Sequence, residues 1–294
     1  MIFNFGSINI DHVYRVADMP QPGETITAIS HEKFLGGKGI NQSIAIAKAG
    51  GEVTHIGAVG TDGDWALEQI KSFDVATNHI MQLDNFTGHA IIYVDDNGEN
   101  QIVISGGTNQ QLTLEQIEKS LHNANPDSDW VLLQNETNLA EEIVTLAKSK
   151  GLRIAYAAAP FVAEVTIKLI DKIDLLAVNE VEASSIAKSL STSISEIPVK
   201  QTLITKGSHG CELILKNNSY TQSAFEVTAV DTTGAGDTFL GSFLARITDG
   251  ESSEEALRYA SAASAIQVTR NGAAPAIPHK NEVIKFLDSQ AENG

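Results

Sequence analysis

Short apolar, β-branched runs alternate along the chain with segments whose apolar residues recur at the helical period. Side chains alternate between faces on a strand and recur about every 3.6 residues on a helix, so the runs predict strands and the periodic segments predict helices. Strands are expected at Ile2–Ile8, Val53–Val59, Trp130–Leu133, Arg153–Ala157, Leu175–Val178 and Thr202–Thr205. Helices are expected at Asn41–Ala49, Trp65–Phe73, Leu114–Leu121, Leu139–Ser149, Glu180–Leu190 and Thr238–Ile247. This alternation is typical of α/β proteins, in which helices cover both faces of a largely parallel sheet.

Two segments depart from the alternation and predict a second, smaller sheet. Residues 89–104 contain two strand-like runs around Asn97-Gly98, which favours a hairpin because a type I′ turn needs positive φ. Residues 12–34 are also expected to be extended, since two prolines and a glycine between residues 20 and 23 exclude a helix. We interpret the small sheet as a lid over a site, and an edge extension that stabilises a dimer is an equal alternative.

The composition favours an ordinary globular protein. Of the 294 residues, 42% are hydrophobic, enough for one domain over residues 1–294 whose lid comprises about residues 11–34 and 86–106. A count of 20 Lys and Arg against 37 Asp and Glu gives a net charge of −17, which argues against nucleic acid or an anionic membrane as a partner. A single cysteine, Cys211, and the lack of a signal peptide or long apolar span predict a cytoplasmic protein.

Residues 225–241 carry the strongest chemical signal. A strand over Phe225–Val230 is expected to lead through a glycine-rich turn into a helix. The N–H groups of Gly234, Ala235 and Gly236 would then be unpaired at the positive end of the helix, which favours an anion. Because Cα–Cβ bonds tilt toward a helix N-terminus, the Asp237 carboxylate points at the same place and can act as a base there. The alternative is an ordinary turn, with glycine for its backbone conformation and aspartate for the helix dipole.

A second glycine-rich segment, Gly36-Gly37-Lys38-Gly39-Ile40-Asn41, lies ahead of a predicted helix. It is not a Walker A loop, because Glu32 stands where that loop has glycine and no Ser or Thr follows Lys38. Together with Asp231–Asp237 and Gly241, it resembles the two signatures of the ribokinase family of carbohydrate kinases, also called the PfkB family. The resemblance implies a ribokinase-like three-layer α/β/α sandwich with a small β-sheet lid. It also implies transfer of the γ-phosphoryl group of ATP to a primary hydroxyl of a small sugar, with Asp237 as the base.

The resemblance implies a sugar site made from several separate segments. Asn9 and Asp11 follow the first strand, and an amide with a carboxylate at a strand end can bind adjacent hydroxyls. Taken alone, such a pair is more often a turn, and Glu136 after its strand is more often a solvated acid. Carried over from the family, the substrate contacts are Asn9, Asp11, Gly37, Lys38, Asn41, Glu136 and Asp237.

The nucleotide and Mg²⁺ contacts also follow from the resemblance. Asn179-Glu180-Val181-Glu182 matches a motif that organises Mg²⁺ waters in the family, and Mg²⁺ needs few protein oxygens because it keeps much of its water shell. An N-cap asparagine before an exposed glutamate is the alternative. Residues 205–210 match the nucleotide loop and also fit a hairpin turn, and the two interpretations are compatible. The implied contacts are Asn179, Thr205, Lys206, Gly207, Gly210, Gly236 and Ser261, with Glu182 holding Mg²⁺ through water.

Ribokinases are typically activated by a monovalent cation, so the resemblance also implies K⁺ or a similar ion. Its ligands would be Asp231 and Thr233 together with backbone carbonyls of Gln267, Arg270 and Gly272. The chain departs from the family at Ala276, where ribokinases commonly have a serine hydroxyl. We therefore expect K⁺ activation that is weaker than with the full ligand set.

The set of sugar contacts matches ribokinases best, so we expect D-ribose to be converted to ribose 5-phosphate. Kinases for fructose, deoxyribose or a nucleoside are alternatives within the family. A catalytically silent sugar- or nucleotide-binding regulator is the alternative outside catalysis, since a fold does not decide function. Asp237 separates these hypotheses, because a regulator is free to lose it. The exposed edges of the lid predict a homodimer that pairs through the lid.

Overall fold

A nine-stranded sheet forms the centre of the molecule. In the computed structural model, which describes residues 1–292, its strand order is β13-β12-β11-β10-β9-β8-β1-β4-β5. The strands are β1 (Ile2–Phe5), β4 (Val53–Val59), β5 (Ile80–Gln82), β8 (Trp130–Gln134), β9 (Arg153–Ala157), β10 (Leu175–Asn179), β11 (Gln201–Thr205), β12 (Cys211–Leu215) and β13 (Asn218–Gln222). Neighbours pair in parallel from β11 to β5, and β12 and β13 complete one edge in antiparallel pairing. The predicted parallel-rich sheet is confirmed.

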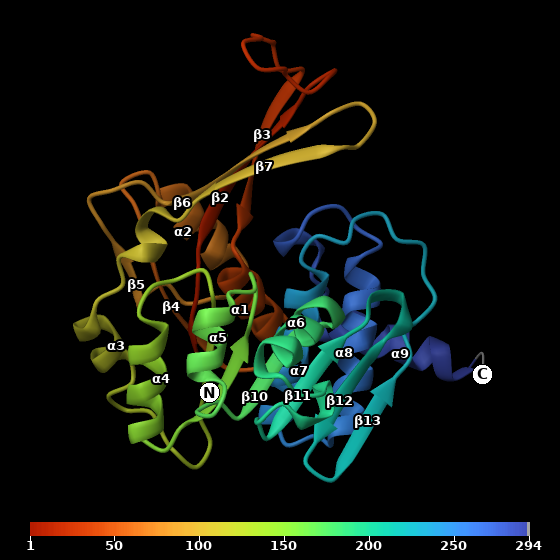
Figure 1. The fold of residues 1–294 in the computed structure, drawn as a ribbon. Helices are drawn as coiled ribbons and strands as arrows, with labels where there is room; N and C mark the ends of the chain where they lie inside the picture. Colours follow the sequence, from red (N-terminus) through yellow and green to blue (C-terminus); the bar gives the residue numbers. More distant parts are fainter. Residues whose placement is uncertain (293–294) are drawn as a thin grey trace.

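Helices cover both faces of this sheet and bury its alternating side chains (Figure 1). On β8, Leu132 packs into the core of one face, and its neighbours Val131 and Leu133 pack into the core of the other. One face carries α1 (Lys38–Lys48), α7 (Ala235–Thr248), α8 (Ser253–Gln267) and α9 (Lys280–Glu292), and the other carries α3 (Leu114–Ser120), α4 (Ala140–Ser149), α5 (Ala163–Leu169) and α6 (Glu180–Leu190). The sequence pattern does not predict α5, α8 or α9. Within residues 1–292, no helix has the length and apolarity to cross a membrane.

A separate four-stranded sheet projects from the main body (Figure 1). Its order is β3 (Ser30–Gly36), β2 (Asn9–Arg15), β6 (Gly88–Val94) and β7 (Asn100–Ser105), and a third core joins it to α1 and to α2 (Asp64–Ser72). The predicted hairpin is confirmed, but its type I′ turn is wrong. Within this turn only Gly98 has positive φ. The connection runs from Asp95 to Glu99 and is longer than two residues, and Asp95 accepts hydrogen bonds from the loop backbone.

Two strand predictions need correction. The first strand ends at Phe5, and β2 begins at Asn9 in the other sheet, because at Gly6 the chain passes so close to Gly39 that a Cβ would lie 2.5 Å from its Cα. The predicted strand Phe225–Val230 is an irregular segment. Its last amide, at Val230, bonds the Val268 carbonyl at the end of α8 instead of a strand.

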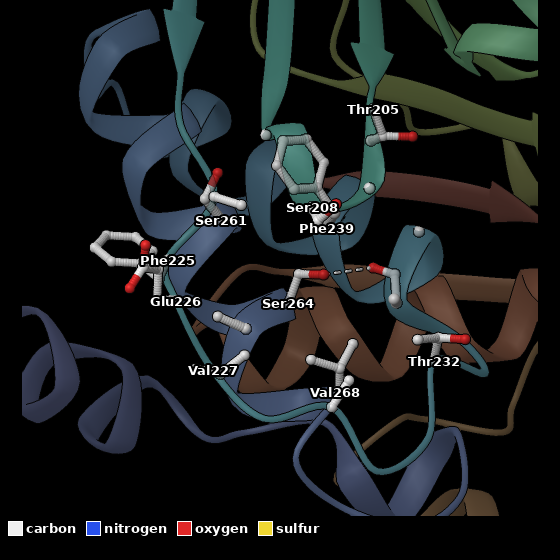
Figure 2. Close-up of a pocket in the computed structure, with 17 residues that line it drawn as sticks. Thr205, Ser208, Phe225, Glu226, Val227, Thr232, Phe239, Ser261, Ser264 and Val268 are labelled. Carbon is white, nitrogen blue, oxygen red and sulfur yellow. Dashed lines mark hydrogen bonds between the residues drawn. The ribbon is translucent and has the colours of Figure 1, made fainter.

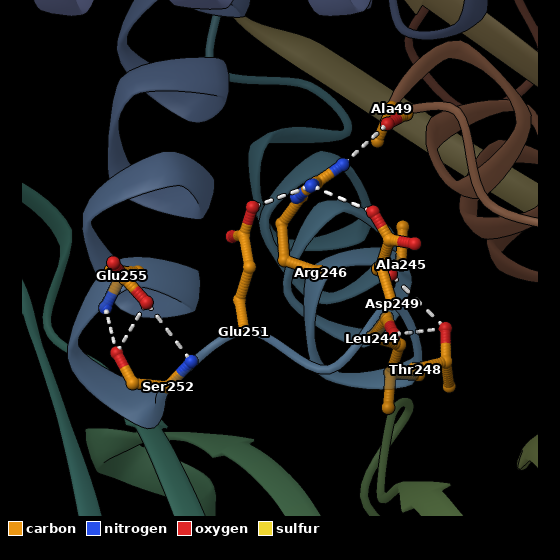
Figure 3. Close-up of polar contacts among 9 residues, drawn as sticks. All are labelled: Ala49, Leu244, Ala245, Arg246, Thr248, Asp249, Glu251, Ser252 and Glu255. Carbon is orange, nitrogen blue, oxygen red and sulfur yellow. Dashed lines mark hydrogen bonds and ion pairs between the residues drawn. The ribbon is translucent and has the colours of Figure 1, made fainter.

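The helix that follows the glycine-rich turn, α7, is fixed along its length. Gly241 lets α7 approach α1, since a Cβ there would lie 2.6 Å from the Ala45 Cβ. At the far end, the buried Arg246 guanidinium donates to the Ala49 carbonyl at 3.2 Å and pairs with Asp249 and Glu251 (Figure 3). These contacts hold the N-terminus of α7 in a constant position relative to α1.

Candidate active site

Asp237 lies in the first turn of α7, which begins after Gly234, a residue with φ of 78°. Its carboxylate is 8% exposed and accepts hydrogen bonds from the side chain of Gln42 at 2.8 Å and of Asn41 at 3.3 Å. Burial raises the pKa of Asp237 to about 6, although Lys38 and the two amides act in the opposite direction. Asp237 is therefore a carboxylate that can accept a proton near neutral pH.

A chain of buried amides orients the partner of Asp237. The Gln134 side chain donates to Gln42 Oε1 at 2.7 Å and to Asn4 Oδ1 at 2.9 Å. Because Gln42 Oε1 is used as an acceptor, its amide nitrogen must face Asp237. The sequence analysis missed Gln42 and Gln134. Their only signal is a polar residue at a helix or strand position where burial is expected.

The glycine-rich turn before α7 differs from the prediction in one amide. The Ala235 N–H donates to the Thr232 carbonyl at 3.2 Å, so the turn itself uses this amide. Among the described residues, the N–H groups of Gly234 and Gly236 have no protein acceptor. A Cβ on Gly236 would meet no heavy atom within 4 Å, so the space beside it is open. Two amides, rather than three, are available to an anion.

Glu136 and Asp11 form an acidic pair beside the glycine-rich segment that begins at Gly36. Glu136 accepts a hydrogen bond from the Lys38 N–H at 2.9 Å and another from the Ser7 hydroxyl. Burial, and then the charge of Glu136, raise the pKa of Asp11 to about 6. Glu136 therefore fixes the glycine-rich turn from Gly36, and Ser7 is a third residue that the sequence pattern does not single out.

Two asparagines are positioned to bind hydroxyl groups. Asn109 holds Asn9, because its amide nitrogen donates to Asn9 Oδ1 at 2.8 Å while its own Oδ1 accepts from the Ile8 N–H at 2.9 Å. Asn41 Oδ1 is buried and has no hydrogen-bond partner among residues 1–292. Buried acceptors are nearly always satisfied, so this atom marks a place for a donor such as a sugar hydroxyl.

Two adjoining cavities of 590 and 280 Å³ open beside the N-terminus of α7. The larger is lined by Thr205, Gly207, Gly210 and Ser261, with Phe225 and Val268 (Figure 2). The smaller contains Lys38, Asn179, Glu182, Gly234 and Asp237. Thr205, Thr232, Ala235, Gly236 and Phe239 line both, so the cavities are continuous around the anion site.

The predicted nucleotide and sugar residues separate into two groups in space. The lining of the two cavities does not include five of the predicted sugar residues, Asn9, Asp11, Gly37, Asn41 and Glu136. Among these five, Asn41 donates a hydrogen bond to Asp237, which lines the smaller cavity. Lys206 is also not among the lining residues, because its ammonium group pairs with Glu212 at 2.7 Å. Its side chain therefore points away from the cavity that its neighbours line.

Asn179 and Glu182 form a capping box at the start of α6. Asn179 Oδ1 accepts from the Glu182 N–H at 2.8 Å, and Glu182 Oε2 accepts from the Asn179 N–H at 2.9 Å. The N-cap interpretation is therefore correct, and both residues also line the smaller cavity. A half-buried carboxylate and an amide at a cavity fit Mg²⁺, which keeps much of its water shell.

The Asp231 carboxylate links two loops below the anion site. Its oxygens accept from the Thr233 N–H at 2.9 Å and from the Gly272 N–H at 2.8 Å. Burial raises its pKa, but these bonds outweigh burial and hold the pKa below its usual value. The predicted cation ligands Asp231, Thr233 and Gly272 are thus together, and the Gln267 side-chain amide donates to the Thr233 carbonyl among them.

Comparisons with known proteins identify the family of the chain. Residues 1–280 match the model of the pfkB family carbohydrate kinases. The ribokinase of Haemophilus influenzae is 34% identical over 299 residues, which cover 96% of this chain and 97% of that protein. The crystal structure of ribokinase from Thermotoga maritima is similar with a TM-score of 0.87 and 33% identity, covering 98% of both chains. Arabidopsis thaliana ribokinase complexed with ribose and ATP has a TM-score of 0.86 and 29% identity, covering 97% of both chains.

Proposed function

The chain belongs to the PfkB family of carbohydrate kinases and has the ribokinase-like fold, and on this basis we propose that it transfers the γ-phosphoryl group of ATP to the 5-hydroxyl of D-ribose. The observation that carries the proposal is the buried Asp237 carboxylate beside the free amides of Gly234 and Gly236. This arrangement places a base next to an anion site, as phosphoryl transfer to an alcohol requires.

Asp237 is the base in this mechanism. It orients the sugar hydroxyl and accepts its proton as the bond to phosphorus forms, while the Gly234 and Gly236 N–H groups take up charge on the transferred phosphoryl oxygens. The raised pKa of Asp237 makes it a better proton acceptor than an ordinary exposed carboxylate. The Gln42 and Asn41 side chains keep the carboxylate aimed at the cavity.

The two cavities suit ATP. We assign the larger cavity, between Phe225 and Ser261, to the nucleoside and the smaller one to the phosphates. Mg²⁺ bound with ATP would neutralise phosphate charge, and Asn179 and Glu182 would hold it through water. Thr205, Gly207 and Gly210 contact the nucleotide in this assignment. Lys206 contributes through its backbone, because its side chain pairs with Glu212.

The sugar lies between the small sheet and α1 in this proposal. Asn9, Asp11, Gly37, Lys38, Asn41 and Glu136 supply its contacts. The unpaired Asn41 Oδ1 and the Asn9 amide held by Asn109 support hydroxyl binding. We choose ribose over other sugars as the proposed substrate because the relative crystallised with ribose and ATP aligns over nearly the whole chain.

A panel of acceptors tests the proposal. ATP consumption should be fastest with D-ribose and slower with deoxyribose, fructose and nucleosides. Faster turnover of another acceptor would reassign the substrate and leave the kinase activity in place. If no acceptor gave turnover while ATP and ribose still bound, the chain would be a regulator rather than a kinase.

The small sheet is proposed to cover the sugar and to pair with the same sheet of a second copy. Ile102, Val103 and Ile104 on β7 are 52%, 65% and 65% exposed, an apolar surface that is unusual on an edge strand. Light scattering at micromolar concentration should show a dimer, and Ile104→Lys should shift it to monomer. A wild-type monomer would contradict the dimer.

The resemblance implies activation by K⁺ through ligands that include Thr233 and Gly272. The carbonyls of both residues already accept hydrogen bonds from Gln267.

A further inference from the structure

The side chain of Gln267 bridges the two loops between which a monovalent cation is expected. Gln267 ends α8 and has none of its surface exposed. Its Nε2 donates to the Thr233 carbonyl at 2.5 Å and is 3.3 Å from the Gly272 carbonyl. Its Oε1 has no hydrogen-bond partner among residues 1–292, so the side chain is held by its nitrogen alone.

A carboxamide nitrogen has two N–H donors and can serve two carbonyl oxygens at once. Nε2 therefore occupies a position within contact distance of both carbonyls, where a cation could bind them. We propose that the Gln267 amide takes the place of the monovalent cation in this chain, so that phosphoryl transfer requires no K⁺. The residues present do not fit the cation unless Gln267 moves away.

The charges nearby also disfavour a further cation. The Lys48 ammonium donates to the Ile277 carbonyl at 2.8 Å, and the Arg270 guanidinium lies 3.4 Å from the Ala276 carbonyl. Both cationic groups bond carbonyls of the segment that follows Gly272, Lys48 from α1 and Arg270 from just before Gly272, and Glu282 pairs with Arg270 at 2.6 Å. Ala276 has no hydroxyl to offer as a ligand. Like charge and a missing oxygen both weaken a cation site here.

The bridge acts on the anion site through the backbone, which makes Gln267 a positioning residue. Thr233 directly precedes Gly234, which lines the smaller cavity. The same end of α8 holds this loop at two further points, because Ser264 donates to the Ala235 carbonyl at 3.2 Å (Figure 2) and the Val268 carbonyl accepts from the Asp231 N–H at 3.1 Å. Gln267 thus fixes the loop where a cation would otherwise do so.

Rates in different salts test the replacement. Wild-type turnover should agree within about twofold in KCl, NaCl and tetramethylammonium chloride at equal ionic strength. Gln267→Ala removes a bridging bond and opens space, so its rate should fall about tenfold in tetramethylammonium chloride and recover at least in part in KCl. Strong K⁺ dependence of the wild type would overturn the proposal.

Thermal unfolding supplies a second measurement that needs no substrate, so only the rate measurement rests on the proposed function. The wild-type Tm should be the same in KCl and tetramethylammonium chloride, whereas Gln267→Ala should be more stable in KCl. The matched control is Gln116→Ala, since Gln116 also donates to two carbonyls, of Gly57 at 2.9 Å and His79 at 3.2 Å. That variant should lose stability equally in both salts.

Two outcomes separate replacement from a merely structural role. A folded Gln267→Ala variant with no K⁺ response in rate or Tm would show that Gln267 replaces nothing. If Gln267→Ala does not fold, the K⁺ responses of Ala276→Ser and of the wild type test the proposal instead. It adds the missing hydroxyl while Gln267 stays in place, so it should show no K⁺ response, and a response would overturn the proposal.

Discussion

Asp231 and Asp237 stand at the two ends of one loop, and their carboxylates have opposite surroundings. Asp231 accepts two backbone N–H groups, which keep its pKa low. Asp237 is buried with only two side-chain amides as donors, and its pKa rises to about 6. The difference shows how one residue type serves two purposes. A carboxylate rich in backbone donors fixes a loop, whereas one that is desolvated and held by neutral amides can take up a proton.

The largest expected effect comes from removing the proton acceptor. Asp237→Asn keeps the shape but has only one oxygen to accept from the Gln42 or Asn41 amide, and it cannot accept a proton. We expect kcat to fall roughly 10²–10⁴-fold while KM changes much less. Steady-state kinetics with the folded variant check this, with circular dichroism as the control. Turnover near the wild-type rate would mean that Asp237 is not the base.

The same substitution should stabilise the protein at high pH. The folded-state pKa of Asp237 is about 6 and the unfolded value is 3.8, so the folded state binds the proton more tightly. The wild type therefore loses stability as pH rises from about 4 to 6, on the order of 3 kcal/mol. Asp237→Asn lacks this loss and should exceed the wild type in urea unfolding at pH 8 by more than at pH 4. An equal difference at both pH values would contradict a raised pKa.

Asp231 should give the opposite pH dependence. Its folded pKa lies below the unfolded one, so its stabilising contribution is present above the unfolded pKa and is lost as pH falls. Asp231→Ala removes the acceptor of the Thr233 and Gly272 N–H groups and with it the link between the two loops. We expect a lower Tm at pH 8, a smaller deficit in acid, and a fall in kcat of about tenfold because the anion loop loosens. A difference in Tm between the variant and the wild type that grew in acid would contradict this.

The turn that carries Asp237 could be predicted from the sequence, whereas the buried amides Gln42 and Gln134 could not. Gly234, Gly236 and Asp237 form a local pattern whose geometry follows from the start of a helix. Gln42 and Gln134 lie in a helix and a strand, and only tertiary packing decides that such side chains point inward. Gln267 was expected to contribute its carbonyl, and the burial of its side chain depends on how α8 packs against the loop.

The fold shows the same limit. Continuous apolar runs predict the parallel strands because both faces of the sheet are buried. The stretch Phe225–Val230 has a similar apolar pattern, yet it lines a cavity, and its Val230 N–H bonds to the end of α8. Helix α8 is rich in alanine and serine, so its apolar period is weak and gives no clear helical signal.

The smallest expected effect tests how far the amides control the base. Replacing Gln42 with methionine keeps the volume but removes the donor 2.8 Å from Asp237 Oδ1. A hydrogen bond to the ionised form lowers a pKa, so its loss should raise the pKa of Asp237 further. The proton acceptor is the ionised form, and the wild-type rate should therefore fall as pH drops through about 6. In Gln42→Met that fall should begin at higher pH, so the rate drops several-fold at pH 6.5 and little at pH 8.5. Gln134→Met removes the hydrogen bonds to Gln42 and Asn4 but leaves the Gln42 donor to Asp237, so it should shift the profile less. Identical acid limbs in all three proteins would show that burial alone sets the pKa of Asp237 and that the amides only aim its carboxylate.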